Sequence, residues 1–252
     1  MLLPFDDTGE GPAVVLLHAG IADRRMWGEQ LGPLAGAGLR VIAMDMPGFG
    51  QAPVAEGKDE PWLDVLETMD AAGVDQAALV GNSLGGAIAQ CVAVVSPERV
   101  SALALISSPA PGMEASQELS DAWETEEYAV EAGDIDGAID AVLDSWLLPD
   151  APPAVRELVG EMQRRAFDLQ LGAPEPEEVP DPLGGDAHVI SGYAGPVLIA
   201  VGEHDMSDFH GAAEKLGGAL PEARREVIYG AGHLAPLEQP EALTELLVDF
   251  LL

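Results

Sequence analysis

Three polar residues, widely separated in the sequence, have the side chains and the local settings that nucleophilic catalysis requires. The first, Ser83, lies in the stretch Gly81-Asn82-Ser83-Leu84-Gly85, between a short apolar run and a helix-compatible run. This G-x-S-x-G pattern is typical of a sharp strand-to-helix turn that lifts a serine hydroxyl out of the edge of a sheet. The amide of Leu84 would point into the same space from a helix N-terminus, which favours developing negative charge. A glycine-rich turn with an incidental serine is the competing interpretation.

The other two residues supply what a serine nucleophile lacks. A serine hydroxyl needs a base within hydrogen-bond reach and a third group that orients the base. Asp205 follows the apolar run PVLIAVG, and His233 follows REVIYG. Each is therefore expected in a loop at the C-terminal end of a strand, in the chain order Ser, Asp, His of an α/β-hydrolase arrangement. Asp208 is an alternative to Asp205.

The rest of the sequence predicts the elements that position these residues. Short apolar runs alternate with helix-compatible segments, which favours an α/β fold with a mostly parallel central sheet and helices on both faces. The six predicted strands span residues 13–17, 39–45, 76–81, 101–107, 196–202 and 225–230.

The interval between the fourth and fifth predicted strands is about ninety residues long, far more than one crossover helix needs. Apolar residues recur in it at spacings of three and four, which predicts helices over residues 115–130, 135–146 and 155–162. In the first of these, Leu119, Trp123 and Val130 would form the inner face. We therefore expect a core formed by residues 1–110 and 190–252 and a helical cap insertion formed by residues 111–189.

Several motifs together resemble the successive signatures of the α/β-hydrolase superfamily, in its helical-capped branch of small esterases and lactonases. They are LLHAG followed by Trp27, DMPGFG, GNSLGG, VGEHD and GAGHLAPLEQPE, and they cover nearly the whole chain. The resemblance implies Ser83 as the nucleophile, His233 as the general base and Asp205 as the orienting acid. It also implies an oxyanion hole formed by the amide of Leu84 and an amide just after the first predicted strand.

The chain departs from the family pattern in two places. The usual His-Gly pair reads His18-Ala19 here, and the spacing to Trp27 assigns the oxyanion position to Gly20, with Ile21 as the alternative. The N-terminus is short and leaves room for only about one hairpin, so the sheet is expected to start abbreviated.

The cap is expected to supply the roof of the substrate pocket. The candidate pocket residues are Ile21, Trp123, Trp146, Met162 and Phe167, with Met26 and Phe49 from the sheet loops. At helical spacing, such residues more often form the interior of the cap than contact a ligand. Arg24 and Arg25 are either receptors for a substrate carboxylate or an exposed, salt-bridged pair. His18 and Asp45 are expected to be structural, Asp45 as an acceptor for backbone donors of the turn in DMPGFG.

Composition excludes several classes of partner. Asp and Glu number 44 against 11 Lys and Arg, a formal net charge of -33, which repels nucleic acids and anionic membranes. The single Cys91 cannot form an intramolecular disulfide, and neither a secretion signal nor about eighteen consecutive apolar residues is present, so a cytoplasmic protein is expected. The histidines lack metal-ligand spacing and no phosphate-cradling motif occurs, so neither a metal nor a cofactor is predicted.

Three functions remain open. The first is hydrolysis of a small carboxylic ester or lactone through an acyl-enzyme. The second uses the same three residues on a different bond, for C–C cleavage of a β-diketone-like substrate or for a non-hydrolytic ring closure. The third is a ligand-binding protein that has kept the fold without the reaction. The sequence does not predict the oligomeric state.

Overall fold

A computed structural model describes residues 1–252 as a seven-stranded sheet in the order β1-β3-β2-β4-β5-β6-β7. All neighbouring strands run parallel except β1, which is antiparallel to β3. This confirms the predicted α/β class. The strands are β1 (Phe5–Thr8), β2 (Ala13–Leu17), β3 (Arg40–Met44), β4 (Ala77–Asn82), β5 (Val100–Ile106), β6 (Val197–Gly202) and β7 (Arg224–Ile228).

The first strand differs from the sequence-based expectation of a hairpin. β1 pairs with β3, opposite Met44 at one end and Val41 at the other, and not with its sequence neighbour β2. Its four residues, FDDT, are all exposed because it is the edge strand. A polar edge strand gives no apolar run, which explains why the pattern of buried strands did not include it.

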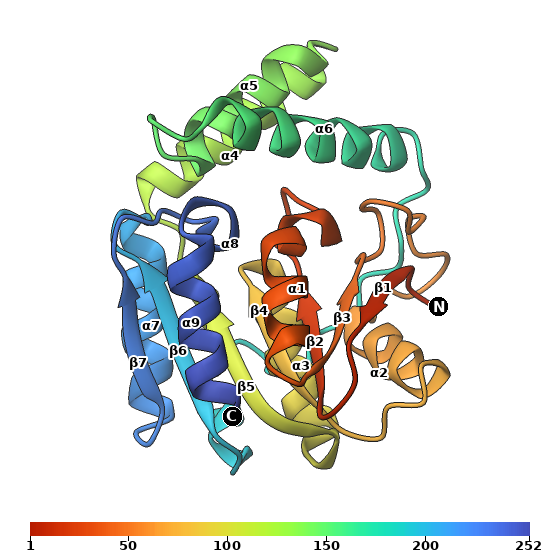
Figure 1. Ribbon diagram of the computed structural model, residues 1–252. Coiled ribbons are helices and arrows are strands. Elements are labelled where there is room, and N and C mark those ends of the chain that lie inside the picture. Colours follow the sequence, from red (N-terminus) through yellow and green to blue (C-terminus); the bar gives the residue numbers. More distant parts are fainter.

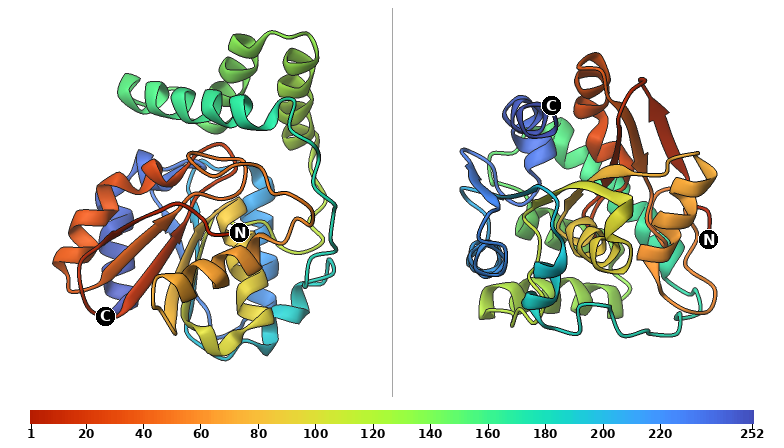
Figure 2. Two further views of the ribbon diagram at one scale, coloured as in Figure 1. Left: turned by 90° about the vertical axis from the view of Figure 1, so that its right-hand side faces the viewer. Right: turned by 90° about the horizontal axis from the view of Figure 1, so that it is seen from below.

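Helices cover both faces of the sheet, as Figures 1 and 2 show. The helices α1 and α9 lie together on one face, and α2, α3 and α7 pack on the other, so that the sheet separates two hydrophobic clusters. The bounds are α1 (Gly28–Gly36), α2 (Pro61–Ala71), α3 (Leu84–Val95), α7 (Ser207–Ala219), α8 (Ala235–Glu238) and α9 (Pro240–Leu251), with short 3-10 turns at Arg24–Trp27, Pro97–Arg99 and Ala187–Gly192. None of these helices combines the length and the apolar character that crossing a bilayer requires.

Three helices lie between β5 and β6, above the sheet in Figure 1, and are called the cap here. They are α4 (Gln117–Glu131), α5 (Ile135–Trp146) and α6 (Pro153–Gln170). The Ser116 hydroxyl and the Asp134 carboxylate accept backbone N–H groups at the starts of α4 and α5, which satisfies donors that a helix N-terminus leaves free.

The expected cap range, residues 111–189, also contains a segment that returns to the body. Residues 171–186 run down beside the sheet (Figure 2), and Glu177 forms a β-bridge with Lys58. Leu183, further along this segment, is buried in the hydrophobic cluster that α2 and α3 share. The segment therefore belongs with the body by its packing, although it follows the cap helices in sequence.

Candidate active site

Ser83 lies between β4 and α3 in a turn that three glycines make possible. Its φ of 52° and ψ of -115° are unusual for a residue with a side chain. A Cβ on Gly81 would lie 2.2 Å from the carbonyl oxygen of Gly85, and one on Gly85 would lie 2.2 Å from that of Leu17. One on Gly86 would lie 2.5 Å from the Ser108 hydroxyl. The glycines are thus required for the close contact of β4, α3 and β2 that the turn needs.

Backbone hydrogen bonds hold this turn and leave one amide at the helix start available. The Ser83 amide donates to the Ile106 carbonyl at 2.9 Å, and the Gly85 amide donates to the His18 carbonyl at 3.0 Å. Leu84 is the first residue of α3, so its amide has no carbonyl within the helix to bind. The only other non-glycine residue with positive φ is Ser107, at the end of the adjacent β5. Backbone strain is therefore concentrated at this edge of the sheet.

Asp205 and His233 meet beside this turn. His233 Nδ1 lies 3.0 Å and 3.2 Å from the two carboxylate oxygens of Asp205, and both residues are buried. Gly202 allows their loops to meet, because a Cβ there would lie 2.0 Å from the Gly232 carbonyl oxygen. The carbonyl of His233 accepts a hydrogen bond from the Asn82 side chain at 3.2 Å. Asp205 thus orients the imidazole ring, and Asn82 holds the backbone that carries it.

Asp208, the alternative acid, has other partners. Its carboxylate accepts the amide and the hydroxyl of Ser116, both at 2.7 Å, at the start of the cap. These hydrogen bonds hold the pKa of Asp208 below its ordinary value, although burial acts in the opposite direction. Asp205 is therefore the acid that contacts the imidazole.

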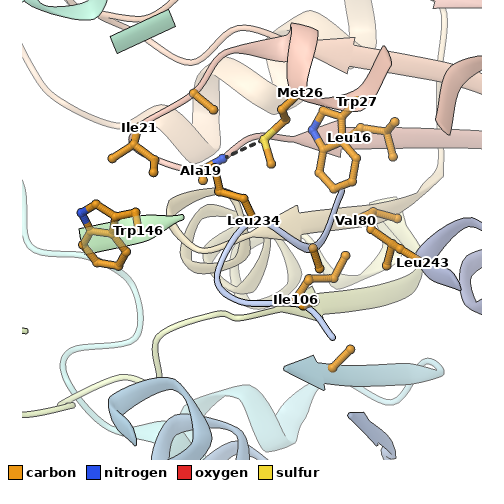
Figure 3. Close-up of a cluster of buried hydrophobic side chains, with 14 of the residues drawn as sticks. Leu16, Ala19, Ile21, Met26, Trp27, Val80, Ile106, Trp146, Leu234 and Leu243 are labelled. Carbon is orange, nitrogen blue, oxygen red and sulfur yellow. Dashed lines mark hydrogen bonds between the residues drawn. The ribbon is translucent and has the colours of Figure 1, made fainter. Parts of the chain in front are cut away.

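Two aromatic rings enclose the imidazole of His233. Trp146 of the cap lies with its ring centroid 4.6 Å from that of His233, and Phe209 of α7 lies at 4.3 Å. Figure 3 shows Trp146 and Ile21 at one end of the hydrophobic cluster that continues to Leu16 and Trp27. The cap therefore contacts the predicted base directly.

Ser83 and His233 both line a cavity of about 200 Å³, called here the Ser83 cavity. Its other lining residues are Ala19, Gly20, Ile21, Leu84, Trp123, Glu126 and Trp146. No direct hydrogen bond joins the Ser83 hydroxyl to His233 in this structure; such bonds often tighten only when a substrate is bound. The cavity joins a hydroxyl, an imidazole oriented by a carboxylate and amides at a helix start, which is an arrangement suited to acyl transfer.

A comparison with protein families agrees with this geometry. Residues 14–246 match the model described as "Alpha/beta hydrolase family". The chain belongs to this family.

Individual family members are related at low identity. The chain is 28% identical over 251 residues to the carboxylesterase YbfK of Bacillus subtilis (strain 168). This match covers 96% of this chain and 81% of that protein. It is 38% identical over 112 residues to a 2-hydroxy-6-oxo-6-phenylhexa-2,4-dienoate hydrolase of Comamonas testosteroni, but this match spans only 42% of the chain and 39% of that protein. The structure of a thermophilic esterase from Thermogutta terrifontis is similar with a TM-score of 0.82, at 26% identity, over 99% of this chain and 92% of that one.

The structure brings together most of the predicted site residues but not all of them. Gly20, Ile21, Leu84, Trp123 and Trp146 line the Ser83 cavity, and Asp205 lies behind His233. The prediction that Met162 and Phe167 line the pocket differs from the structure. Met162 and Phe167 lie on α6, and their side chains are buried in the hydrophobic cluster instead. The Met162 sulfur accepts a hydrogen bond from the Asp23 amide at 3.3 Å. They attach the cap to the body because their apolar face is turned toward it.

Two residues of the site were not predicted, because neither lies in a recognisable sequence motif. Phe209 packs on His233, and Glu126 brings a carboxylate into the lining of the Ser83 cavity. Burial raises the pKa of Glu126, whose carboxylate accepts a hydrogen bond from the Gln163 side chain at 3.3 Å. A signal for Glu126 was available, because it lies three residues after Trp123 and so shares its helix face.

A second cavity, of about 350 Å³, lies on the other side of Leu84 and contains none of Ser83, Asp205 and His233. It is mainly apolar and is lined by residues of α2 and α3, the loop after β5 and the return segment, among them Trp62, Ile88, Cys91, Met113 and Leu183. Leu84 borders both cavities, and its side chain therefore forms part of the wall between them.

His18 has the structural role expected of it. Its Nδ1 lies 2.8 Å from the Ala19 carbonyl and its Nε2 accepts the Met46 amide at 2.8 Å. Complete burial lowers the pKa of His18, which favours the neutral ring that these two bonds require.

The charged residues of the neighbouring loops are paired with one another. Asp45 accepts the amides of Arg24 and Gln51, at 2.9 Å and 2.8 Å, and forms an ion pair with the Arg24 guanidinium. Arg25 pairs with Asp23 at 2.9 Å and with Glu161 at 3.4 Å. Neither arginine lines the Ser83 cavity, so the structure favours the salt-bridged pair over a carboxylate receptor.

Proposed function

We propose that the protein hydrolyses a small carboxylic ester or lactone through an acyl-enzyme on Ser83. The observation that carries this proposal is the contact between His233 Nδ1 and the buried Asp205 carboxylate, beside a serine in a strained strand-to-helix turn. A carboxylate on Nδ1 fixes the tautomer in which Nε2, on the opposite side of the ring, can accept a proton from a hydroxyl.

Each step of the reaction then has a group in the Ser83 cavity. His233 removes the proton of Ser83 as the hydroxyl attacks the substrate carbonyl. The amides of Leu84 and Gly20 stabilise the tetrahedral oxyanion, with Ile21 as the alternative second donor. The imidazolium gives its proton to the leaving alkoxide, and a water molecule, activated by the same imidazole, releases the acyl group from Ser83.

The names of two relatives support an ester substrate. YbfK is named a carboxylesterase and matches nearly the whole chain, and the similar thermophilic structure is an esterase. A small molecule without negative charge also suits a cavity of about 200 Å³ in a chain with a net charge of -33, which repels nucleic acids and anionic lipids.

The C–C bond hydrolase is the second candidate, because the Comamonas testosteroni relative carries that kind of name and the same three residues would serve. Its name specifies a dienoate, which is an anion. The lining of the Ser83 cavity contains Glu126 and no lysine or arginine. That charge disfavours an anionic substrate, and the ester remains the better supported function.

The intact mass of the protein after exposure to a fluorophosphonate probe tests the activated serine. We expect one adduct on the wild type and none on Ser83→Ala or His233→Ala, with p-nitrophenyl acetate turnover reduced by about 10⁴-fold or more in both variants. His188→Ala, which removes an exposed histidine outside the lining of the Ser83 cavity, is the control and should label normally. An adduct that persists in Ser83→Ala, or wild-type protein that is folded and never labels, contradicts the proposal.

A further inference from the structure

Glu126 is the one acidic side chain in the lining of the Ser83 cavity, and the lining contains no lysine or arginine. It comes from the cap helix α4, as does Trp123, and faces the cavity together with Trp146 of α5. A carboxylate beside two indole rings at a substrate cavity calls for an explanation, because a half-buried charge is costly unless something compensates it.

Three other acidic residues of the cap have arginine partners within the protein. Asp144 pairs with Arg156 and Glu161 with Arg25, and Arg164 pairs with Asp136. Glu126 has no such ion pair; its hydrogen-bond donor is the neutral amide of Gln163, at 3.3 Å. Burial raises the pKa of Glu126, and no neighbouring positive charge lowers it. The protein thus leaves this one cavity-facing acid without a counter-charge.

We propose that Glu126, with Trp123 and Trp146, forms a subsite for a cationic group, so that the preferred substrate is an ester that carries an ammonium. The inference rests on the proposed function of Ser83 for the reaction, but the subsite itself is a binding feature. The carboxylate supplies the charge that a cation needs, and the indole faces are the aromatic surfaces that attract ammonium groups most strongly. A substrate carboxylate in the same place is repelled by Glu126.

The positions of the two tryptophans fit this arrangement. Trp123 is 49% exposed, whereas Trp146 is 8% exposed and packs on His233. Both belong to the cap, as Glu126 does, whereas Ser83 belongs to the body. An ammonium held by these three cap residues therefore lies on the cap side of the cavity, and the ester carbonyl lies toward Ser83.

Three acetate esters of similar size test the subsite. The first is the acetate ester of choline, the second is its neutral isostere in which carbon replaces the quaternary nitrogen, and the third is the acetate ester of a hydroxybutanoate anion. The rate at which acetic acid is released, measured by titration at constant pH, gives kcat/KM for each ester. We expect the wild type to prefer the cation to the neutral isostere by about tenfold, and the anion to be the poorest substrate.

Glu126→Gln should remove this preference, so that the ratio of kcat/KM for the cationic ester to kcat/KM for the neutral isostere falls from about ten to about one, because only the cation makes a charge contact with the carboxylate. The control is Glu127→Gln, which makes the same change in net charge at an exposed position one residue away. Its preference should match the wild type, and a preference that falls equally in both variants would assign the effect to the overall charge and overturn the subsite.

A binding measurement separates the subsite from the reaction. Choline and its neutral carbon isostere are titrated against Ser83→Ala, with and without Glu126→Gln, and binding is followed by tryptophan fluorescence and calorimetry. Tighter binding of choline that depends on Glu126 supports the subsite even if no ester is turned over, in which case the proposed function alone fails. Equal binding of choline and its isostere, or equal turnover of the cationic and neutral esters by the wild type, overturns the subsite and leaves the serine hydrolase unaffected.

Discussion

The edge of the sheet that carries Ser83, Asp205 and His233, called here the serine edge, and the cap above it are built with different tolerances. At the serine edge, an added methyl group on Gly81, Gly85 or Gly202 would lie 2.0 Å to 2.2 Å from a backbone oxygen. In the cap, the 15 residues of α4 include only two that are buried, Leu119 and Ala122. The turn at Ser83 therefore allows one arrangement of its backbone, whereas most positions of α4 can change without loss of packing.

The contacts between the cap and the body are specific. The cap is attached through buried apolar side chains of α5 and α6 and through hydrogen bonds, among them those from Arg165 to the Gly50 carbonyl at 2.9 Å and from Gln170 to the Gly48 carbonyl at 3.1 Å. Trp146 adds the ring contact with His233. The serine edge can therefore preserve one chemistry while changes on the inner face of the cap alter which substrate reaches it.

The largest expected effect separates two aspartates that lie three positions apart. Asp205→Asn should reduce kcat by about 10⁴-fold, because the amide favours the wrong tautomer of His233. Asp208→Asn should leave kcat near the wild-type value and cost no more than about 1 kcal/mol of unfolding free energy, because its partner is Ser116 at the start of the cap. Ester turnover and urea denaturation of both variants measure the two quantities. Similar losses of kcat in both would mean that the serine edge and the cap are not independent.

The next effect concerns the backbone of the serine edge. Gly85→Ala places a methyl group 2.2 Å from the Leu17 carbonyl oxygen, and relief of that overlap should cost about 3 kcal/mol of unfolding free energy. Displacement of the adjacent Leu84 amide should also reduce kcat by about 100-fold. The same substitution at Gly211, a mid-helix position of α7 with no heavy atom within 4 Å of the new Cβ, should stabilise the protein by about 0.5–1 kcal/mol. Equal stability of the two variants would contradict the steric account of the turn.

The sequence singled out residues that the structure brings together at the serine edge, and it did so for a physical reason. A strained turn, a close backbone contact and a hydrogen-bonded acid-base pair each demand particular residue types, so Ser83, Gly85, Asp205 and His233 carry readable signals. Each of the six apolar runs forms a strand of the sheet, within one or two residues at its ends, because a strand covered on both faces must be apolar nearly throughout.

The cap and the first strand were harder to predict. Helical periodicity located α5 and α6, but it could not distinguish residues that face the Ser83 cavity, such as Trp146, from residues that face the body, such as Met162. That distinction depends on how the helices are tilted on the body, which no local pattern specifies. The strand β1 is short and fully exposed, and its pairing with β3 is a long-range choice.

The smallest expected effect concerns the junction of the two regions at Glu238. One carboxylate oxygen of this half-buried residue accepts the Leu148 amide, just after α5, at 3.0 Å, and the other accepts the Gly232 amide, next to His233, at 2.8 Å. Burial raises the pKa of Glu238, while these two amides and His233 act to lower it. The carboxylate thus joins the end of a cap helix to the loop of the predicted base.

Glu238→Gln can accept only one of these two amides well, because its NH₂ group would face the other N–H donor. We expect a loss of about 1–2 kcal/mol of unfolding free energy, the cost of one buried donor left without a partner. Amide hydrogen exchange should become faster in two segments, residues 147–151 and 231–235, and remain unchanged in the central strands. The exposed Glu245→Gln on α9 is the matched control and should show neither change. Faster exchange throughout the sheet would mean that Glu238 stabilises the body as a whole, whereas faster exchange confined to the two segments would identify it as a local link between the end of α5 and the loop of His233.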